Sequence, residues 1–283
     1  MTASLNPYIS QFGEEFDAEK SSQYRMTIQY ALGGLSYALL DTETHTLIAL
    51  ECFQSNLLTD SDDLFRALER ALESKGLNNK AFQSVICLVD NRICNLVPKP
   101  LFNEADQAKY LDFAFQVPDN YSIASEPLVA EPSFNVFAQS KAFQDKMSVK
   151  WKNVRYTHSS TVFINSAMES DVVTGIFVLV RNRDFDMMIK KEGNLFFFNN
   201  FKFNTKEDFA YFLLFAMEQN DFSGHDTPVT FSGLIRPASE IIDLCGRYVK
   251  DIRFAADPHI LKVSKALEEV PFQYYHIHYQ AFR

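Results

Sequence analysis

Glycine is scarce in this sequence, and its scarcity limits the kinds of site that the chain can build. Of 283 residues only 9 are glycine, whereas an average usage of about 7% would give about 20. Loops that wrap phosphate groups need several residues without a Cβ, so that the backbone can approach the phosphate. The composition therefore argues against an ordinary P-loop or Rossmann enzyme. Phenylalanine is abundant instead, with 27 residues beside 12 tyrosines and a single tryptophan.

Long apolar runs and basic clusters are also missing. No stretch reaches the roughly 18 apolar residues that span a bilayer, and residues 1–16 carry Glu14 and Glu15 instead of a basic start and an apolar run. The net charge is −9, and the nearest approach to a basic segment, residues 141–152, is interrupted by Asp145. Nucleic-acid-binding proteins usually present a basic face. We therefore expect a cytoplasmic protein with no nucleic-acid partner and no membrane insertion.

The four cysteines lack the spacing of a metal site. No two of them form a CxxC pair, and Cys87 and Cys94, the nearest two in the sequence, are separated by charged residues. Cys52, Cys87 and Cys245 fall within apolar patterns. We expect reduced, buried side chains that act as small hydrophobic residues, and no structural zinc site.

Apolar patterning in the first part of the chain predicts a three-stranded meander, then a helix and a further strand. Gly33 and Gly34 separate the first two strands, where a tight hairpin turn favours residues that tolerate positive φ. The helix is expected to begin after an N-cap at Thr59, because apolar residues then recur on one helical face. The predicted strands are residues 24–32, 35–41, 46–53 and, after the helix, 84–89.

The same order of elements recurs in the second part of the chain. Asn204 or Thr205 is the expected N-cap of its helix, and Glu207 and Asp208 lie in the first turn, where carboxylates favour the helix dipole. Because the two patterns are separated by a nearly constant offset, we interpret them as an internal duplication. The predicted strands are residues 172–180, 185–189, 195–203 and, after the helix, 228–234.

The two patterns divide the chain into a polar leader and two halves. No Ser- and Gly-rich linker separates the halves, so we expect them to pack closely. Prolines mark the loops between the patterns, and further helices are expected over residues 103–115, 140–150 and 159–168 and after Pro237. The predicted division is 1–23 for the leader, 24–170 for the first half, and 171–283 for the second half with a C-terminal extension.

A meander, a helix and further strands, present twice, resemble the actin-like ATPase fold, in which two ribonuclease-H-like domains flank a cleft. Residues 27–41 and 175–189 look like its two phosphate-loop hairpins. Phe231-Ser232-Gly233-Leu234, followed by Pro237, looks like the loop that receives adenosine. The resemblance implies an α/β fold with mixed sheets, each with an antiparallel three-strand meander followed by helices.

A narrower resemblance concerns a bacterial family of short actin-fold proteins that is defined as a domain of unknown function. The segments 26–40 and 95–98, with Leu101 and Phe102, carry it. The resemblance as a whole covers residues 24–254.

The resemblance also assigns a set of candidate nucleotide-binding residues. They lie on both sides of the expected cleft and are Gly33, Gly34, Ser36, Ser232 and Gly233. Active members of the fold hold Mg²⁺ through an aspartate at the end of the first strand of each half, since a hard cation needs carboxylates.

Both of these aspartates are missing here. Gln29 or Tyr30 stands at the first position, and the corresponding strand of the second half ends without an aspartate. Asp184 or Asp186 would have to substitute, and either is displaced along the hairpin. We therefore predict no catalytic residue and no bound metal, and hydrolysis of ATP by the family's mechanism is not expected.

Two histidine-containing groups have alternative interpretations. On a strand, His276 and His278 would share one face and form part of a metal site, but no third ligand lies nearby, so an aromatic C-terminal strand or tail is preferred. Ser159 and Ser160 follow His158, and helix N-capping by one of the serines is preferred over a nucleophilic role.

Aromatic residues of the second half also have two interpretations. Residues 196–198 are three phenylalanines and are predicted to form a central, buried strand. The helix that follows is apolar on several sides, through residues such as Tyr211 and Phe215. It is expected to lie between the halves, and docking of a partner protein is the alternative.

Three functional hypotheses remain. The leading one is a non-catalytic actin-fold protein that acts as a scaffold or protein-binding module, with another protein as its partner. The second is a diverged nucleotide-dependent ATPase or sugar-kinase-like phosphotransferase, which needs carboxylates in the cleft from among Asp41, Asp90, Asp184 and Asp186. The third is a non-catalytic binder of a small ligand. The sequence leaves the oligomeric state open.

Overall fold

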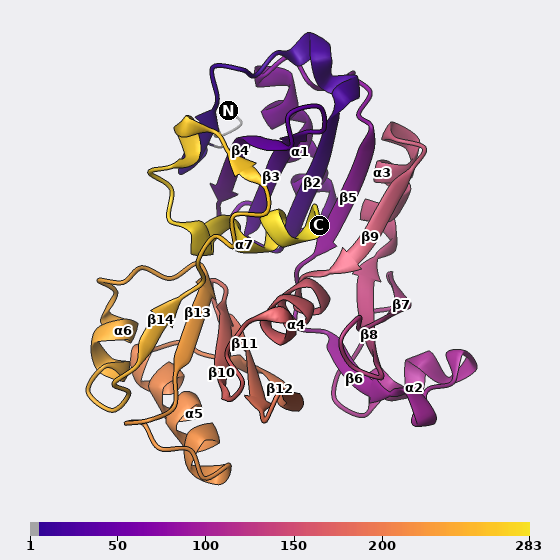
Figure 1. Ribbon diagram of the computed structural model, residues 1–283. Helices are drawn as coiled ribbons and strands as arrows, with labels where there is room; N and C mark the ends of the chain where they lie inside the picture. The colour runs from indigo at the N-terminus through magenta and orange to yellow at the C-terminus, as the bar shows by residue number, and fades with distance from the viewer. Residues whose placement is uncertain (1–5) are drawn as a thin grey trace.

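The computed structural model describes residues 6–283, which form two lobes and a projecting arm (Figure 1). One mixed sheet forms the base of each lobe, and a third, three-stranded sheet forms the arm together with helix α2. The C-terminal helix α7 lies between the two lobes, beside α4 (Figure 1). The cleft described below opens where the lobes meet.

The first sheet has the strand order β1-β4-β3-β2-β5-β9, with β15 beside β4. Strands β2, β3 and β4 form the predicted antiparallel meander, and β2 pairs in parallel with β5. Gly33 has φ +86° at the β2–β3 turn, as the hairpin prediction requires. The strands are β1 (Ile9–Phe12), β2 (Tyr24–Ala31), β3 (Gly34–Asp41), β4 (Thr46–Gln54), β5 (Ser84–Val89), β9 (Val154–His158) and β15 (Lys262–Val263).

The second sheet repeats this topology with the order β12-β11-β10-β13-β14. Its first three strands are antiparallel, and β10 pairs in parallel with β13. The predicted duplication therefore has a counterpart in strand order and direction. All six residues of β10 are buried, as expected for a central strand covered on both faces. The strands are β10 (Gly175–Val180), β11 (Asp184–Lys191), β12 (Asn194–Lys202), β13 (Val229–Gly233) and β14 (Ile252–Phe254).

Helices cover both faces of each sheet. Helices α1 and α3 share a hydrophobic core with one face of the first sheet, and α7 covers the other face. Helices α5 and α6 cover the outer face of the second sheet, while α4 packs with α7 on its inner face. The helices are α1 (Ser61–Ser74), α2 (Gln107–Asp112), α3 (Lys141–Lys150), α4 (Ser159–Glu169), α5 (Lys206–Gln219), α6 (Glu240–Cys245) and α7 (Phe272–Ala281).

The arm is inserted between β5 and β9 of the first sheet. Strands β6 and β7 both pair with β8, and α2 packs on them through Leu111. The predicted helix over residues 103–115 is wrong at both ends, because the segment forms a short 3₁₀ turn and the six-residue α2. The strands are β6 (Cys94–Pro98), β7 (Tyr121–Pro127) and β8 (Ser133–Ser140).

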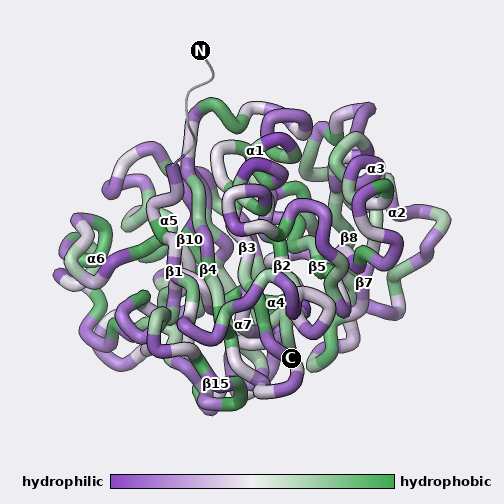
Figure 2. Tube along the Cα trace, turned by 90° about the horizontal axis from the view of Figure 1, so that it is seen from above, coloured by the Kyte–Doolittle hydropathy of each residue, from purple (hydrophilic) through white to green (hydrophobic). Residues whose placement is uncertain are grey.

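Hydropathy follows this architecture. Figure 2 shows hydrophobic stretches along inner strands such as β5, with hydrophilic stretches on many of the outer loops. All four cysteines are free and buried, which confirms their predicted role as small hydrophobic residues. Within residues 6–283 no helix is both long and apolar enough to cross a membrane.

Helix caps confirm some local predictions and correct others. Thr205 and Asp208 form a reciprocal capping box at the start of α5. Helix α1 is capped by Asp60 instead of Thr59, because the carboxylate of Asp60 accepts from the Asp63 N–H at 2.8 Å. Neither Ser159 nor Ser160 caps α4, since the His158 ring accepts from the Ser160 N–H at 3.2 Å.

Two predictions for the aromatic residues of the second half are wrong. Strand β12, with its three phenylalanines, lies at the edge of its sheet, and Phe196 is 55% exposed. Helix α5 lies on the outer face of the second sheet and not between the lobes, so Tyr211 and Phe215 face solvent. Apolar patterning does not distinguish an edge strand from a central one, because the pairing partners lie elsewhere in the chain.

The two ends of the described chain both join the first sheet. Strand β1, within the predicted polar leader, pairs with β4, and so does β15 near the C-terminus. His276 and His278 lie on α7, so the predicted aromatic strand at this end of the chain is wrong. The division of the chain at residue 170 remains a prediction.

Candidate functional site

A cleft of about 960 Å³ opens between the two lobes. The β2–β3 hairpin lines it on the side of the first lobe, and the β10–β11 hairpin lines it on the side of the second. The first turn of α7 also contributes, through Gln273 and Tyr274. These are the two hairpins that the sequence pointed to, so the duplicated fold brings them to a common space.

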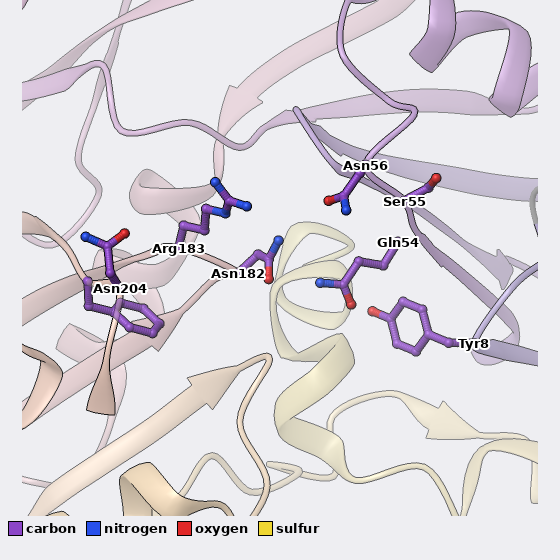
Figure 3. A pocket seen from close by; sticks show the side chains of 8 residues that line it. Tyr8, Gln54, Ser55, Asn56, Asn182, Arg183 and Asn204 are labelled. Carbon is purple, nitrogen blue, oxygen red and sulfur yellow. The ribbon is translucent and has the colours of Figure 1, made fainter. Parts of the chain in front are cut away.

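An outer chamber of about 700 Å³ adjoins this cleft and shares several lining residues with it. Figure 3 shows its two walls. Tyr8 and residues 54–56 line the side of the first lobe, and Asn182, Arg183 and Asn204 line the side of the second. The chamber is therefore formed jointly by both lobes.

A buried arginine lies in the turn between β10 and β11. Arg181 follows the last residue of β10, and its side chain is only 8% exposed. Its guanidinium donates two hydrogen bonds to Asp186, at 2.9 and 2.7 Å, and one from Nε to Asp90. Asp184 accepts a longer bond at 3.2 Å. One internal cation thus pairs with three carboxylates.

This network joins the two lobes. Asp90 follows β5 of the first lobe and also accepts a hydrogen bond of 2.8 Å from the Gln29 amide. Asp186 lies on β11 of the second lobe and accepts further bonds from Ser160 and Asn200. Of the two residues at the expected position of the first magnesium-binding aspartate, Gln29 thus pairs with Asp90, while Tyr30 stacks on Phe143 with 4.0 Å between ring centroids. The protein's own side chains therefore connect the lobes at the inner end of the cleft.

Electrostatics keep this network charged. Burial disfavours the charged form of Asp186, but the adjacent Arg181 guanidinium outweighs burial and holds the pKa of Asp186 below its usual value. Burial likewise disfavours the charged form of Arg181, and Asp186 and Asp90 raise its pKa well above the ordinary one. Asp184 differs, because burial raises its pKa despite the same arginine.

The candidate residues of the first hairpin line the cleft, yet their polar groups are engaged within the protein. The Gly33 N–H donates to the Leu58 carbonyl at 2.8 Å. The Ser36 hydroxyl hydrogen-bonds the His278 ring at 2.7 Å. Gly33, Gly34 and Ser36 all line the cleft, and their role in nucleotide binding remains a prediction.

The candidate residues of the second lobe are placed by packing. Ser232 is 2% exposed and its hydroxyl donates to the Val178 carbonyl at 3.3 Å. Gly233 lines the cleft at the end of β13 with φ +84°. A Cβ at this position would lie 2.2 Å from the Val180 carbonyl oxygen, so glycine is needed where β13 approaches β10.

Replacing Gly233 with alanine is therefore expected to lower the free energy of unfolding by about 2–4 kcal/mol, through a strained φ and a backbone clash. Urea unfolding measures the loss. Gly193→Ala is the matched control, because Gly193 has φ +82° but a Cβ added there would meet nothing within 4 Å. Its loss should stay at about 1 kcal/mol, the cost of the left-handed conformation alone. Equal losses in the two variants would contradict the assigned packing role.

Residues 13–252 match the protein family described as "Protein of unknown function (DUF3822)". The chain belongs to this family. No curated protein matches the sequence. A Bacteroides thetaiotaomicron protein with an actin-like ATPase fold and unknown function superposes with a TM-score of 0.74 at 16% identity, over 85% of this chain and 93% of that chain.

A second similar structure is the PilM–PilN type IV pilus biogenesis complex. It matches with a TM-score of 0.58 at 10% identity, over 87% of this chain and 92% of that chain. At sequence identities this low, the similarity shows a shared fold and nothing about function. This DUF3822 protein therefore has the actin-like ATPase fold with two ribonuclease-H-like domains, as the order of its elements predicted.

In this DUF3822 protein the carboxylates named for a phosphotransferase do not form an open site. Asp90 and Asp184 line the cleft but pair with Arg181, and Asp186 is fully buried. Asp41 lies elsewhere and accepts from the Glu43 N–H at 2.8 Å in the β3–β4 turn. Sequence reasoning missed the role of Arg181, although an arginine close to an expected aspartate position was a signal that could have found it.

The C-terminal histidines are structural. His278 lies between Thr27 and Ser36, with a hydrogen bond of 2.7 Å on each ring nitrogen. His276 bonds Ser166 of α4 at 2.9 Å. Burial lowers their pKa values to about 3 for His278 and about 4 for His276, so both rings are neutral at pH 7. They attach α7 to the first sheet and to α4.

Proposed function

We propose that this chain is a non-catalytic actin-fold protein that acts as a scaffold or protein-binding module. One observation carries the proposal. The guanidinium of Arg181 follows β10, close to where the second magnesium-binding aspartate of the fold is expected, and it pairs with carboxylates of both lobes. A cation supplied by the chain itself takes the part that a metal ion would take.

The geometry makes displacement of this arginine by a metal unfavourable. Bidentate pairing between Arg181 and a fully buried Asp186 is among the stronger hydrogen-bonded arrangements in proteins. A divalent cation would have to break it and leave the buried guanidinium without its bidentate partner, which costs several kcal/mol. The internal hydrogen bonds of Gly33 and Ser36 further support a cleft without a phosphate grip.

Two observations support a partner protein. PilM, which shares the fold, is seen in a complex with PilN. In this chain, Tyr211 and Phe215 stack on one another on the exposed side of α5, with 5.8 Å between ring centroids. Exposed aromatic pairs of this kind are typical of protein interaction sites.

Calorimetric titration of the full chain with ATP and Mg²⁺, together with an assay for released phosphate, tests the loss of nucleotide chemistry. We expect no binding in the micromolar range and no phosphate release. A parallel titration with ATP and EDTA separates metal-dependent from metal-independent binding. Micromolar affinity with Mg²⁺-dependent turnover would overturn the proposal.

A second candidate function is non-catalytic binding of a small ligand. The observation that favours it is the cleft itself, whose volume of about 960 Å³ lies within the range of known ligand sites, about 300–1,000 Å³. Mass spectrometry of protein purified under native conditions tests this candidate. A metabolite present in equal amount with the protein would support it, and protein free of small molecules would count against it.

A further inference from the structure

Two of the arginines that line the cleft form no ion pair within residues 6–283. Five charged residues line it, and two of them, Asp90 and Asp184, are paired with Arg181. Arg92 and Arg183 remain, and within residues 6–283 neither forms an ion pair with a carboxylate. The cleft therefore presents two guanidinium groups without an ion-pair partner, while the three carboxylates around Arg181 are held by that arginine and by hydrogen bonds from Gln29, Ser160 and Asn200.

The two unpaired arginines occupy different parts of the space. Arg183 lines both the outer chamber and the cleft, at the tip of the β10–β11 hairpin (Figure 3). Arg92 lines the cleft only, with its guanidinium 5.6 Å from the centre of the Phe115 ring. An occupant of the cleft can therefore meet both arginines, and one that continues into the outer chamber stays in contact with Arg183.

Carboxamide groups line the outer chamber between its aromatic residues. Gln54 and Asn56 lie on one wall, and Asn182 and Asn204 lie on the other (Figure 3). Their side-chain amides form no hydrogen bond within residues 6–283, and no carboxylate lines the chamber. A carboxamide donates and accepts at once, as a peptide group does, so such groups can pair with the main chain of an extended segment.

The size of the space also favours an extended occupant. The outer chamber of about 700 Å³ and the cleft of about 960 Å³ share Gln54, Asn56 and the hairpin tip at Asn182 and Arg183. Because they share these residues the two spaces are continuous, and the cleft alone already lies near the upper end of the volumes usual for a small-molecule site, about 300–1,000 Å³. Leu32 and Leu234, which are 64% and 41% exposed, also line the cleft and offer apolar contacts.

We propose that the cleft and its outer chamber bind an extended, acidic segment of a partner protein. The carboxamides hydrogen-bond the main chain of the segment, and Arg183 and Arg92 each pair with an acidic side chain. The inference rests on the proposed function, since it names the kind of partner that the protein-binding module takes.

Selection of a random dodecapeptide phage library on the immobilised full chain tests this proposal. Fluorescence anisotropy then gives the affinity of a labelled peptide that the selection yields. We expect Asp and Glu to be enriched, affinity to fall as salt rises, and Arg183→Glu to weaken binding at least about tenfold. Arg92→Glu should act in the same direction.

The matched control is Arg70→Glu, which makes the same charge change at an exposed position of α1 outside the cleft. Its affinity for the peptide should stay within about twofold of wild type, because exposed charges this far apart are screened. A peptide with lysine in place of its acidic residue should recover affinity for Arg183→Glu. Circular dichroism checks that each variant is folded.

Several results would overturn the inference: selected peptides without acidic enrichment, or equal binding by Arg183→Glu and Arg70→Glu. Binding only of a co-purified metabolite in the cleft would also overturn it. None of these depends on ATP turnover, which is the result that overturns the proposed function. The two proposals can therefore fail separately.

Discussion

Replacing Arg181 with alanine is expected to lower the free energy of unfolding by about 3–5 kcal/mol. The guanidinium is 8% exposed and Asp186 is 0% exposed, so the variant leaves a carboxylate buried without its cation. It also removes the ion pair to Asp90 that joins the two lobes. Urea unfolding followed by circular dichroism measures the loss.

Two variants make this result specific to the ion pair. Arg183→Ala, at an arginine two positions away that forms no such pair, should change the stability by no more than about 0.5 kcal/mol. The double variant Arg181→Ala/Asp186→Asn should recover part of the loss, because it removes the most deeply buried of the carboxylate charges left without a cation. If Arg181→Ala were as stable as Arg183→Ala, the network would not hold the lobes together.

Acidification is expected to destabilise the protein below about pH 6.5. Burial lowers the pKa to about 4 for His158 and His276 and to about 3 for His278. An unfolded histidine titrates near pH 6.5. Between these values the unfolded chain binds more protons than the native one, so stability is complete above about pH 6.5 and falls as the pH drops toward 4.

The free energy of unfolding is expected to depend steeply on pH. Each histidine that stays neutral in the native state contributes about 1.4 kcal/mol per pH unit within this window, or about 4 kcal/mol for three. Burial raises the pKa of Glu126 and Asp184, and these groups oppose the trend because the native state binds their protons more readily. Urea unfolding at intervals between pH 7.5 and 5 measures the slope.

A pair of variants assigns the slope to its source. His278→Gln should reduce the slope of the unfolding free energy by about 1.4 kcal/mol per pH unit, because one buried neutral ring is removed. His225→Gln should change the slope far less than His278→Gln does, because the His225 side chain is 80% exposed and its ion-pair partner Asp226 is 77% exposed. A slope that is the same in wild type and His278→Gln would show that this histidine does not resist protonation in the native state.

Much of the fold could be predicted from local sequence patterns. The strands of both meanders follow from apolar runs bounded by turn residues, and the capping box of Thr205 and Asp208 is readable from four consecutive residues. The repeated order of these elements was enough to predict the duplicated ribonuclease-H-like architecture. Packing then places the two hairpins on either side of a common cleft.

Long-range partners could not be predicted from these patterns. Asp90 and Arg181 are 91 positions apart in the sequence, and Thr27 and His278 are 251 apart. The alternation of His276 and His278 suited a strand, but α7 is a helix packed between the two lobes, where tertiary contacts outweigh local propensity. The edge position of β12 could not be predicted either, because it depends on which strands pair in the folded protein.

The sequence by itself determined the strands of the two meanders, their duplication and the absence of aspartates at the two expected magnesium positions. Those properties depend on residue type and on spacing over a few positions. Only the tertiary structure decided which cation the carboxylates of the two lobes share, because an ion pair needs two groups within hydrogen-bonding distance, and folding alone brings Arg181 to Asp90 and Asp186. Folding likewise decided that, among the described residues, Arg92 and Arg183 line the cleft without a carboxylate partner.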